Sequence, residues 1–295
     1  MDSLSACIRV YVDERARNRS LTGRSPRTIG YRLDSFCDAV GRSRDPRTIS
    51  RGEVEAWLGS ADWSDSTVRS RISAVRQLYQ WLAIRDLVSH DPTHGIRAPK
   101  PKRAVPRALS TDVVARIYQA CPDVRAELIC SLMVQSALRC EEVSQLEVTD
   151  IDRKEKSIYV REGKGGHDRL VPLFEETENL LIRYLAEWPA TFGPLLRSYT
   201  SGRRMHPTYV SDLVSKVMYD AGVKVKARDG VSAHALRHTA ASDTLEACGD
   251  LTVVQELLGH ESLVSTQVYL RRANLGHMRR GGAGRYYRRL PDPAA

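Results

Sequence analysis

The chain has 295 residues, and its 45 lysines and arginines against 36 aspartates and glutamates give a formal net charge of +9. This length predicts about two domains, each with its own core. Hydrophobic residues at 42% and charged residues at 27% exclude wholesale disorder and a fibrous repeat. The longest apolar run, over residues 128–134, is far short of the roughly 20 residues that span a membrane, and the N-terminus lacks the apolar core of a signal peptide. We therefore expect a cytoplasmic protein.

The positive charge is spread over several segments. The net charge is +4 over residues 1–99, +4 over 100–109, −3 over 110–272 and +4 from residue 273 onward. Arginine supplies 37 of the 45 cations, and its planar guanidinium suits the geometry of phosphate. This distribution favours a polyanionic partner that touches several parts of the chain, although the same charge would also keep the protein in solution.

Residues 1–99 have the apolar spacing of helices. One helix is expected near residues 3–17, a second starts at Ser25–Pro26, and Ser50 with Glu53 forms a capping box ahead of a third. A fourth helix carries an apolar stripe between residues 68 and 82. Its opposite side offers three cations as candidate DNA contacts: Arg69, Arg71 and Arg76. We predict a four-helix domain with a basic face.

A proline-rich, basic segment follows this domain. Four prolines between residues 91 and 109 interrupt any helix and predict an interdomain linker over residues 100–109. The linker supplies three further candidate DNA contacts: Lys100, Lys102 and Arg103.

The pattern after the linker is mixed. Helices are expected at about 111–120, 124–136, 176–187, 207–221, 234–247, 251–258 and 263–272. Short β-branched runs at 158–160 and 170–171 flank a Gly163–Gly166 turn, as in an antiparallel hairpin. The expected fold class is mainly α with a small antiparallel β-sheet, in which the four-helix domain precedes an α+β domain over residues 110–272.

Reactive side chains concentrate in four segments: SALRCEEVSQL, REGKGGHDRLVPL, HALRHTAAS and LLGHESLVSTQVYL. These segments supply six candidate site residues: Arg139, Lys164, His234, Arg237, His260 and Tyr269. Each residue alone has a structural explanation, such as a surface arginine, a turn lysine or a capping histidine. Together they are the parts that phosphodiester chemistry without a metal requires: a tyrosine nucleophile, two guanidinium groups for the non-bridging oxygens, and an acid for the departing 5′ oxygen.

The spacing of these residues supports a common site. His234 and Arg237 lie three residues apart and share one face of a helix. Gly259 is a natural residue just after a helix, which leaves His260 in a turn. Tyr269 follows on the last expected helix, where it would project to one side of the core.

These motifs resemble the tyrosine site-specific recombinases, the family of phage integrases and Xer-type chromosome-resolving enzymes. The run HALRHT…LLGHESLVSTQVYL is very specific, and the resemblance covers nearly all of the chain. It implies a core-type DNA-binding domain over residues 1–99, a catalytic domain over 110–272, and a basic tail over 273–295 that docks on a neighbouring protomer or is disordered. No cofactor and no metal are implied.

The resemblance also implies a role for each site residue. Arg139 and Arg237 would clamp the scissile phosphate together with His260, and Glu142 would support this clamp from behind. Lys164, at the tip of the hairpin, would be the general acid. His234 would assist as an acid or base, and Tyr269 would be the nucleophile that attacks the phosphate.

Three positions depart from the family pattern. Ala137 stands where a glycine is usual, and a positive φ there would be costly for alanine. Gly165–Gly166–His167 stands where a second lysine often appears. His238 matches a frequent family histidine, which we interpret as a packing or supporting residue.

The implied reaction is strand exchange at specific DNA sites through a 3′-phosphotyrosyl intermediate and a Holliday junction. The implied partners are double-stranded DNA at attachment or core sites, a homotetramer, and an accessory DNA-bending or directionality factor. The lack of room for a separate N-terminal arm-binding domain leaves a compact phage or mobile-element integrase or a host Xer-type resolvase. The arginine-rich, extended tail favours the integrase, which integrates and excises a phage or mobile element. A DNA-binding protein without catalysis is the alternative from another class. A metal-dependent nuclease is disfavoured, because clustered carboxylates are missing.

Overall fold

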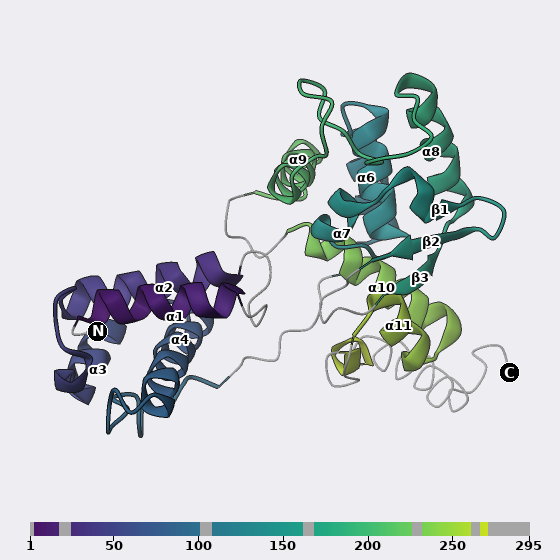
Figure 1. Ribbon diagram of the computed structural model, residues 1–295. Coiled ribbons are helices and arrows are strands. Elements are labelled where there is room, and N and C mark those ends of the chain that lie inside the picture. Colours follow the sequence, from purple (N-terminus) through teal and green to yellow (C-terminus); the bar gives the residue numbers. More distant parts are fainter. Residues whose placement is uncertain are drawn as a thin grey trace, which may run out of the picture. The chain divides into compact units, whose positions relative to one another are not determined.

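The computed structural model describes residues 3–17, 25–100, 108–161, 168–225, 232–260 and 266–270. The chain divides into two compact units, Met1–Lys102 and Arg103–Ala295, and the boundary falls inside the segment predicted as the linker (Figure 1). Each unit has its own hydrophobic core. None of the helices in the described part of the chain has the length and apolar character needed to cross a bilayer.

Helices make up the described part of the first unit. Its elements are α1 (Leu4–Arg17), α2 (Ser25–Val40), the 3₁₀ turn η1 (Pro46–Thr48), α3 (Arg51–Gly59) and α4 (Asp65–Ile84). The four predicted helices are confirmed. The capping box is also present, since the Ser50 hydroxyl accepts a hydrogen bond from the Glu53 amide and the Glu53 carboxylate accepts one from the Ser50 amide at 2.9 Å. Aromatic side chains fill the core, with Tyr11, Phe36 and Tyr79 fully buried.

The second unit is built around one buried helix. Its α-helices are α5 (Thr111–Gln119), α6 (Val124–Val134), α7 (Cys140–Gln145), α8 (Glu175–Glu187), α9 (Pro207–Asp220), α10 (His234–Cys248) and α11 (Leu251–Leu258). Helix α6 contains the longest apolar run of the sequence and packs against α8, α9 and α10. A helix that is apolar on all sides needs such neighbours around it.

A small antiparallel sheet lies beside these helices, with strands in the order β1 (Ile151–Asp152), β2 (Ser157–Val160) and β3 (Arg169–Pro172). The predicted hairpin of β2 and β3 is confirmed, and Val160 pairs with Arg169. The hairpin turn lies outside the described residues. Strand β3 packs on α11, which brings Arg169 to the end of that helix (Figure 1).

Two local features differ from the sequence-based expectation. The short helix α7 was not predicted; it begins directly after Arg139, whose backbone amide donates to the Glu142 carboxylate at 2.7 Å. The helix expected over 263–272 is interrupted by the 3₁₀ turn η3 (Gln267–Tyr269), while Thr266 and Leu270 on either side of the turn are helical; the rest of that range lies outside the described residues. This turn packs on α10 and so directs Tyr269 inward.

Candidate active site

Arg139 and Arg237 meet at the C-terminal end of α11. Arg139 lies just before α7 and Arg237 in the first turn of α10, yet both guanidinium groups donate to the carbonyl oxygen of Leu258, Arg139 at 3.2 Å. This carbonyl ends a helix, where backbone oxygens lack partners and carry partial negative charge. The fold therefore brings two arginines 98 positions apart to one point.

The Glu142 carboxylate holds these two arginines and a third. Arg169 donates to both of its oxygens, each at 2.9 Å, while Arg139 contacts one oxygen at 2.5 Å and Arg237 the other at 3.5 Å. Burial by itself would raise the pKa of Glu142. The hydrogen bonds and charge of Arg169, followed by the charges of Arg237 and Arg139, outweigh burial and lower the pKa to about 2.

This arrangement leaves positive charge uncompensated, because the three guanidinium groups share a single carboxylate among the described residues. Burial, then Arg139, lowers the pKa of Arg237 to about 9, so its guanidinium remains protonated at neutral pH. The side chains of Arg169 and Arg237 are 8% and 6% exposed, whereas that of Arg139 is 19% exposed. The cluster thus carries two surplus positive charges and opens toward solvent at Arg139, which makes it suited to an anion.

Ala137, which stands where the family usually has glycine, adopts the strained backbone conformation with positive φ. Its φ is +56° and its side chain is fully buried. Its carbonyl oxygen accepts a hydrogen bond from Arg237, so the left-handed turn helps to place that guanidinium. A non-glycine residue in this region costs roughly 1–2 kcal/mol.

Gly259 is constrained in two ways. Its φ is +57°, the left-handed region in which a helix commonly ends at glycine. A Cβ at this position would lie 3.0 Å from Cδ and 3.1 Å from Nη1 of Arg169. Glycine therefore leaves room for Arg169 to pass close to the end of α11 on its way to Glu142, and a Cβ there would have to push this side chain aside.

The two predicted site histidines lie beside this cluster and are neutral at neutral pH. Burial, then the charges of Arg237, Arg139 and Arg169, lowers the pKa of His260 to about 4, and its Nδ1 is 3.0 Å from the Thr266 hydroxyl. Burial of part of the ring, then Arg237 and Arg139, also lowers the pKa of His234. Both imidazoles are therefore available as hydrogen-bonding groups without a charge of their own.

The sequence predicts that Tyr269 projects to one side of the core, and this expectation is wrong. It is 3% exposed because η3 turns it toward α10, and its hydroxyl is 2.6 Å from Nδ1 of His238. Burial raises the pKa of Tyr269, while the charges of Arg237 and Arg139 oppose this shift. Tyr269 is therefore within the electrostatic reach of the arginine cluster.

The predicted DNA contacts of α4 divide into two groups. Arg71 is not part of an exposed basic face: it is 8% exposed, lies 3.9 Å from the ring of Trp63 and 5.3 Å from that of Trp57, and donates to Ser35 at 2.9 Å. The stacking accounts for the correction, since an indole face stabilises a buried guanidinium.

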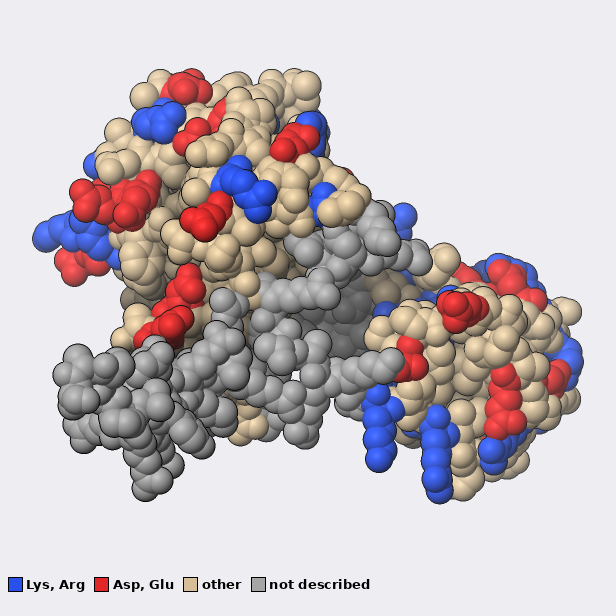
Figure 2. All heavy atoms as spheres, turned by 180° about the vertical axis from the view of Figure 1, so that it is seen from behind, with Lys and Arg blue, Asp and Glu red and all other residues tan. Residues whose placement is uncertain are grey.

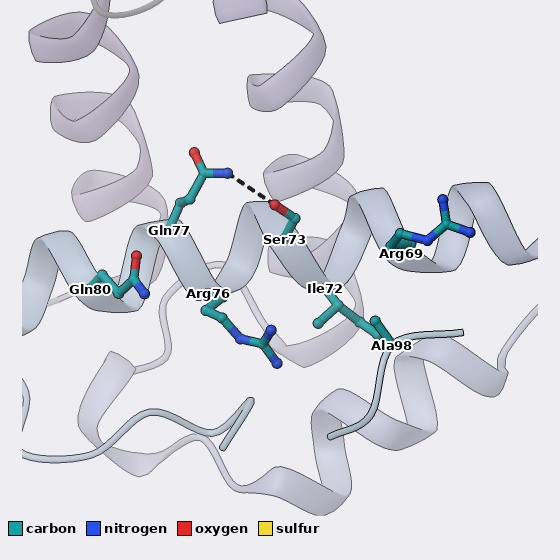
Figure 3. Close-up of a pocket in the computed structure, with 7 residues that line it drawn as sticks. All are labelled: Arg69, Ile72, Ser73, Arg76, Gln77, Gln80 and Ala98. Carbon is teal, nitrogen blue, oxygen red and sulfur yellow. Dashed lines mark hydrogen bonds between the residues drawn. The ribbon is translucent and has the colours of Figure 1, made fainter. Parts of the chain in front are cut away.

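Arg69 and Arg76 border a hollow of about 290 Å³ along α4, which Ser73, Gln77 and Gln80 also line (Figure 3). Arg69 donates to the carbonyl of Pro99 at 3.1 Å and Arg76 to the Thr93 hydroxyl at 3.2 Å, so both hold the following segment against the helix. Lys100 is exposed at the end of this segment. The other predicted linker contacts, Lys102 and Arg103, lie outside the described residues, as does Lys164.

The face of the molecule in Figure 2 shows no large patch of a single charge among the described residues. Figure 2 shows basic and acidic side chains interspersed on the visible face of each unit. Within the described residues, no three His, Cys, Asp or Glu side chains group as metal ligands.

Comparisons with known proteins agree with this geometry. The model of the Phage integrase family matches residues 107–275. Tyrosine recombinase XerC of Chromobacterium violaceum is 33% identical over 261 residues, which cover 85% of this chain and 86% of the relative. This chain belongs to the phage integrase family of tyrosine recombinases. The family resemblance and the fold class inferred from the sequence are confirmed.

Two solved structures share the fold of this tyrosine recombinase. A lambda integrase dimer bound to a COC′ core site has a TM-score of 0.75 at 17% identity, with coverage of 90% of this chain and 77% of that chain. A lambda integrase tetramer bound to a Holliday junction has a TM-score of 0.73 at 17% identity, covering 89% and 78%. The family cleaves and rejoins DNA, so this chain is an enzyme of site-specific recombination.

Sequence reasoning missed two residues of this recombinase's site. Arg169 lies on the inward row of β3 with the buried Val171, and a charged residue in such a row requires a buried partner. His238 directly follows Arg237, and the sequence predicts it only as a packing or supporting residue. The alternation of β3 could have identified Arg169, but nothing local to the sequence places His238 beside Tyr269.

Proposed function

We propose that Tyr269 attacks a DNA phosphodiester held by Arg139 and Arg237, forming a 3′-phosphotyrosyl bond and releasing a 5′ hydroxyl. The 5′ hydroxyl of a partner strand reverses the step, and two rounds exchange the strands through a Holliday junction. The observation that carries this proposal is the convergence of three arginines on one carboxylate within reach of a buried tyrosine.

The charge of the cluster fits the reaction. A phosphodiester carries one negative charge, and its pentacoordinate transition state carries two. Because three guanidinium groups share the single charge of Glu142, the two surplus positive charges match the transition state better than the ground state. The phosphate enters on the side of Arg139, the most exposed of the three.

The remaining roles follow from the hydrogen bonds available. Nδ1 of His260 is 3.0 Å from the Thr266 hydroxyl, and in the tautomer in which Nδ1 accepts from this hydroxyl, Nε2 carries the proton and donates to a non-bridging oxygen. Lys164 is the general acid for the 5′ oxygen, and His234, exposed near Arg139 and Arg237, assists in proton transfer. Glu142 and Arg169 fix the clamp.

The first unit contributes contacts to the double helix along α4. The row of Ser73, Gln77 and Gln80 in Figure 3 offers amide and hydroxyl groups of the kind that contact base edges, and Lys100 adds charge for the phosphates. Arg69 and Arg76 hold the segment that borders this row.

Assembly and biological role extend the proposal. The lambda integrase tetramer on a Holliday junction supports a homotetramer for this chain too, with the basic tail over 273–295 docking on a neighbour and an accessory factor controlling direction. In the cytoplasm, the tetramer would integrate and excise a phage or mobile element. The similarity to XerC favours a second role, resolution of chromosome or plasmid dimers.

The chemistry is tested with nicked suicide DNA carrying a candidate site from the flanking genomic sequence. The full chain, in EDTA, is expected to form an SDS-resistant covalent adduct, and Tyr269→Phe none. Tyr209→Phe, at an exposed tyrosine of α9, is the matched control. Wild type that binds this DNA without an adduct would favour the DNA-binding protein that lacks catalysis, and loss of cleavage in EDTA would favour a nuclease.

The biological role is tested by supplying pairs of sites. Recombination between two different attachment sites supports integration, whereas recombination between two copies of a chromosomal resolution site supports the Xer-type role. Truncation after residue 276 that left recombination and tetramers intact would remove the docking of the tail.

A further inference from the structure

His238 contacts the hydroxyl of Tyr269, the atom that attacks in the proposed function. Nδ1 and Oη are 2.6 Å apart, and the two ring centroids 5.7 Å apart. A phenol that is only 3% exposed needs an acceptor for its proton. Among the described residues, the structure places Nδ1 of His238 at hydrogen-bond distance from this hydroxyl and shows no hydrogen bond from His234 to Tyr269; Nδ1 is the acceptor in the tautomer that carries its proton on Nε2.

We propose that His238 is a catalytic residue that accepts the proton of Tyr269. As the proton moves from Oη to Nδ1, the phenolic oxygen forms its bond to phosphorus and the bond from phosphorus to the 5′ oxygen breaks. The departing oxygen takes a proton from the general acid. On rejoining, the 5′ hydroxyl attacks, the phenolic oxygen leaves, and His238 returns the proton to it. This inference rests on the proposed function.

The surroundings of His238 keep it neutral before DNA binds. It faces His234 and Arg237 on α10, His260 after α11 and Tyr269 on η3. Burial, then His234 and Arg237, lowers the pKa of His238, so its imidazole is neutral at neutral pH, and in the tautomer with the proton on Nε2 the lone pair of Nδ1 points to the phenol.

A bound phosphodiester changes this balance. Its negative charge between Arg139 and Arg237 offsets the positive charge that disfavours protonation of His238, and the pKa of His238 therefore rises when the substrate is in place. The proton stays on Tyr269 in the resting enzyme, because burial raises the phenol pKa. Proton transfer is thus coupled to occupation of the clamp.

The test measures the rate of adduct formation on suicide DNA against pH. His238→Gln keeps a hydrogen-bonding group of similar size but cannot take the proton, and the rate at pH 7 is expected to fall about 100-fold. Wild type should reach a plateau above the pKa of His238. In His238→Gln the rate should instead keep rising with pH, since only phenolate formed by hydroxide can attack.

Two further comparisons separate a base from a structural residue. Imidazole in the buffer should restore part of the rate in His238→Ala, and His206→Asn, an exposed histidine that caps α9, should behave as wild type. On DNA with sulfur in place of the bridging 5′ oxygen, the leaving group needs no acid. Lys164→Ala should therefore recover on this DNA, and His238→Gln should remain slow.

The outcomes distinguish the inference from the function it rests on. Wild type that forms the Tyr269 adduct while His238→Gln matches its rate and pH profile overturns the role of His238 and leaves the recombinase chemistry standing. Equal recovery of His238→Gln and Lys164→Ala on the sulfur-containing DNA would also overturn it. Wild type that binds DNA and forms no adduct would refute both.

Discussion

Arg71 in the first unit and Arg237 in the second are both buried, but their surroundings differ. Arg71 lies against the faces of two tryptophans and donates to a serine hydroxyl. Arg237 donates to the carbonyls of Ala137 and Leu258 and shares one carboxylate with two other arginines.

The groups that surround a buried arginine distinguish a structural role from a functional one. Arg71 stacks on aromatic faces and donates to a neutral hydroxyl, and its buried Nε has no hydrogen-bond partner among the described residues. Around Arg237 the protein gathers three guanidinium groups on one carboxylate, so two positive charges are unmatched among the described residues, which costs stability unless an anion arrives. Several cations gathered around one carboxylate, and not the burial of a single cation, mark the functional arginine.

The largest effect is expected at Arg237 itself. Arg237→Lys should lower the rate of adduct formation about 1,000-fold, because an ammonium group cannot serve two carbonyls and a phosphate oxygen in the fixed geometry of a guanidinium. Arg71→Lys should leave the rate within a factor of two. The rates are measured on suicide DNA, and equal losses in the two variants would end the distinction between these arginines.

Removing the shared carboxylate should affect folding. Glu142→Gln leaves the buried guanidinium groups of Arg169 and Arg237, and the partly exposed one of Arg139, without the counter-charge they share and is expected to destabilise the second unit by about 3 kcal/mol. The matched change at the exposed neighbour, Glu141→Gln, should shift stability by less than about 0.5 kcal/mol. Urea unfolding of the full chain measures both, and a Glu142→Gln midpoint equal to that of Glu141→Gln would contradict the charge argument.

The stability of the second unit should fall as the pH drops from about 6.5 toward 4. His260 has a folded pKa of about 4 against 6.5 for an unperturbed histidine, so in this range the unfolded chain binds more protons than the folded one. The loss from His260 is at most about 3 kcal/mol. His260→Gln should flatten the pH dependence, measured by urea midpoints; an unchanged slope would show that another group carries it.

Arg71→Ala tests whether Arg71 stabilises the first unit without taking part in the reaction. Loss of the stacking on Trp57 and Trp63 should cost the first unit about 2 kcal/mol, seen in thermal unfolding. The adduct rate at saturating DNA should stay that of wild type. Loss of DNA affinity with unchanged stability would instead make Arg71 a DNA contact.

The smallest effect is expected at the strained turn that supports Arg237. Ala137→Gly relieves the positive φ but gives up a buried methyl group and gains freedom when unfolded, so a net stabilisation of about 0.5 kcal/mol is expected. Calorimetry measures the shift. A clear destabilisation would mean that the methyl group contributes more than the strain.

The fold was predictable where the signal is local. The capping box of Ser50 and Glu53, the change of period at the hairpin and the glycine after α11 are each contained within a few residues, and all three appear in the structure. Helix α7 and strand β1 escaped prediction because six and two residues are too short to show a period.

The sequence predicted which residues belong to the candidate site but not the contacts between them. The motifs supplied Arg139, Arg237 and Tyr269, but the partner shared by the arginines and the contact of Tyr269 with His238 depend on long-range packing. Arg71 was an avoidable error. It lies three residues after Val68 and four before the buried Val75, on the apolar stripe itself, and two tryptophans precede it.

Gly259 has a consequence for mutational scanning of this recombinase. It has no side chain that could bind DNA, yet another residue there would strain the left-handed turn and press its Cβ against Arg169, which holds the carboxylate shared with Arg139 and Arg237. A scan should therefore score position 259 as intolerant to substitution as the reacting residues, for steric reasons alone. A ranking of positions by loss of activity would place Gly259 among the reacting residues. Separate measurements of the adduct rate and of DNA affinity would distinguish Gly259 from those residues.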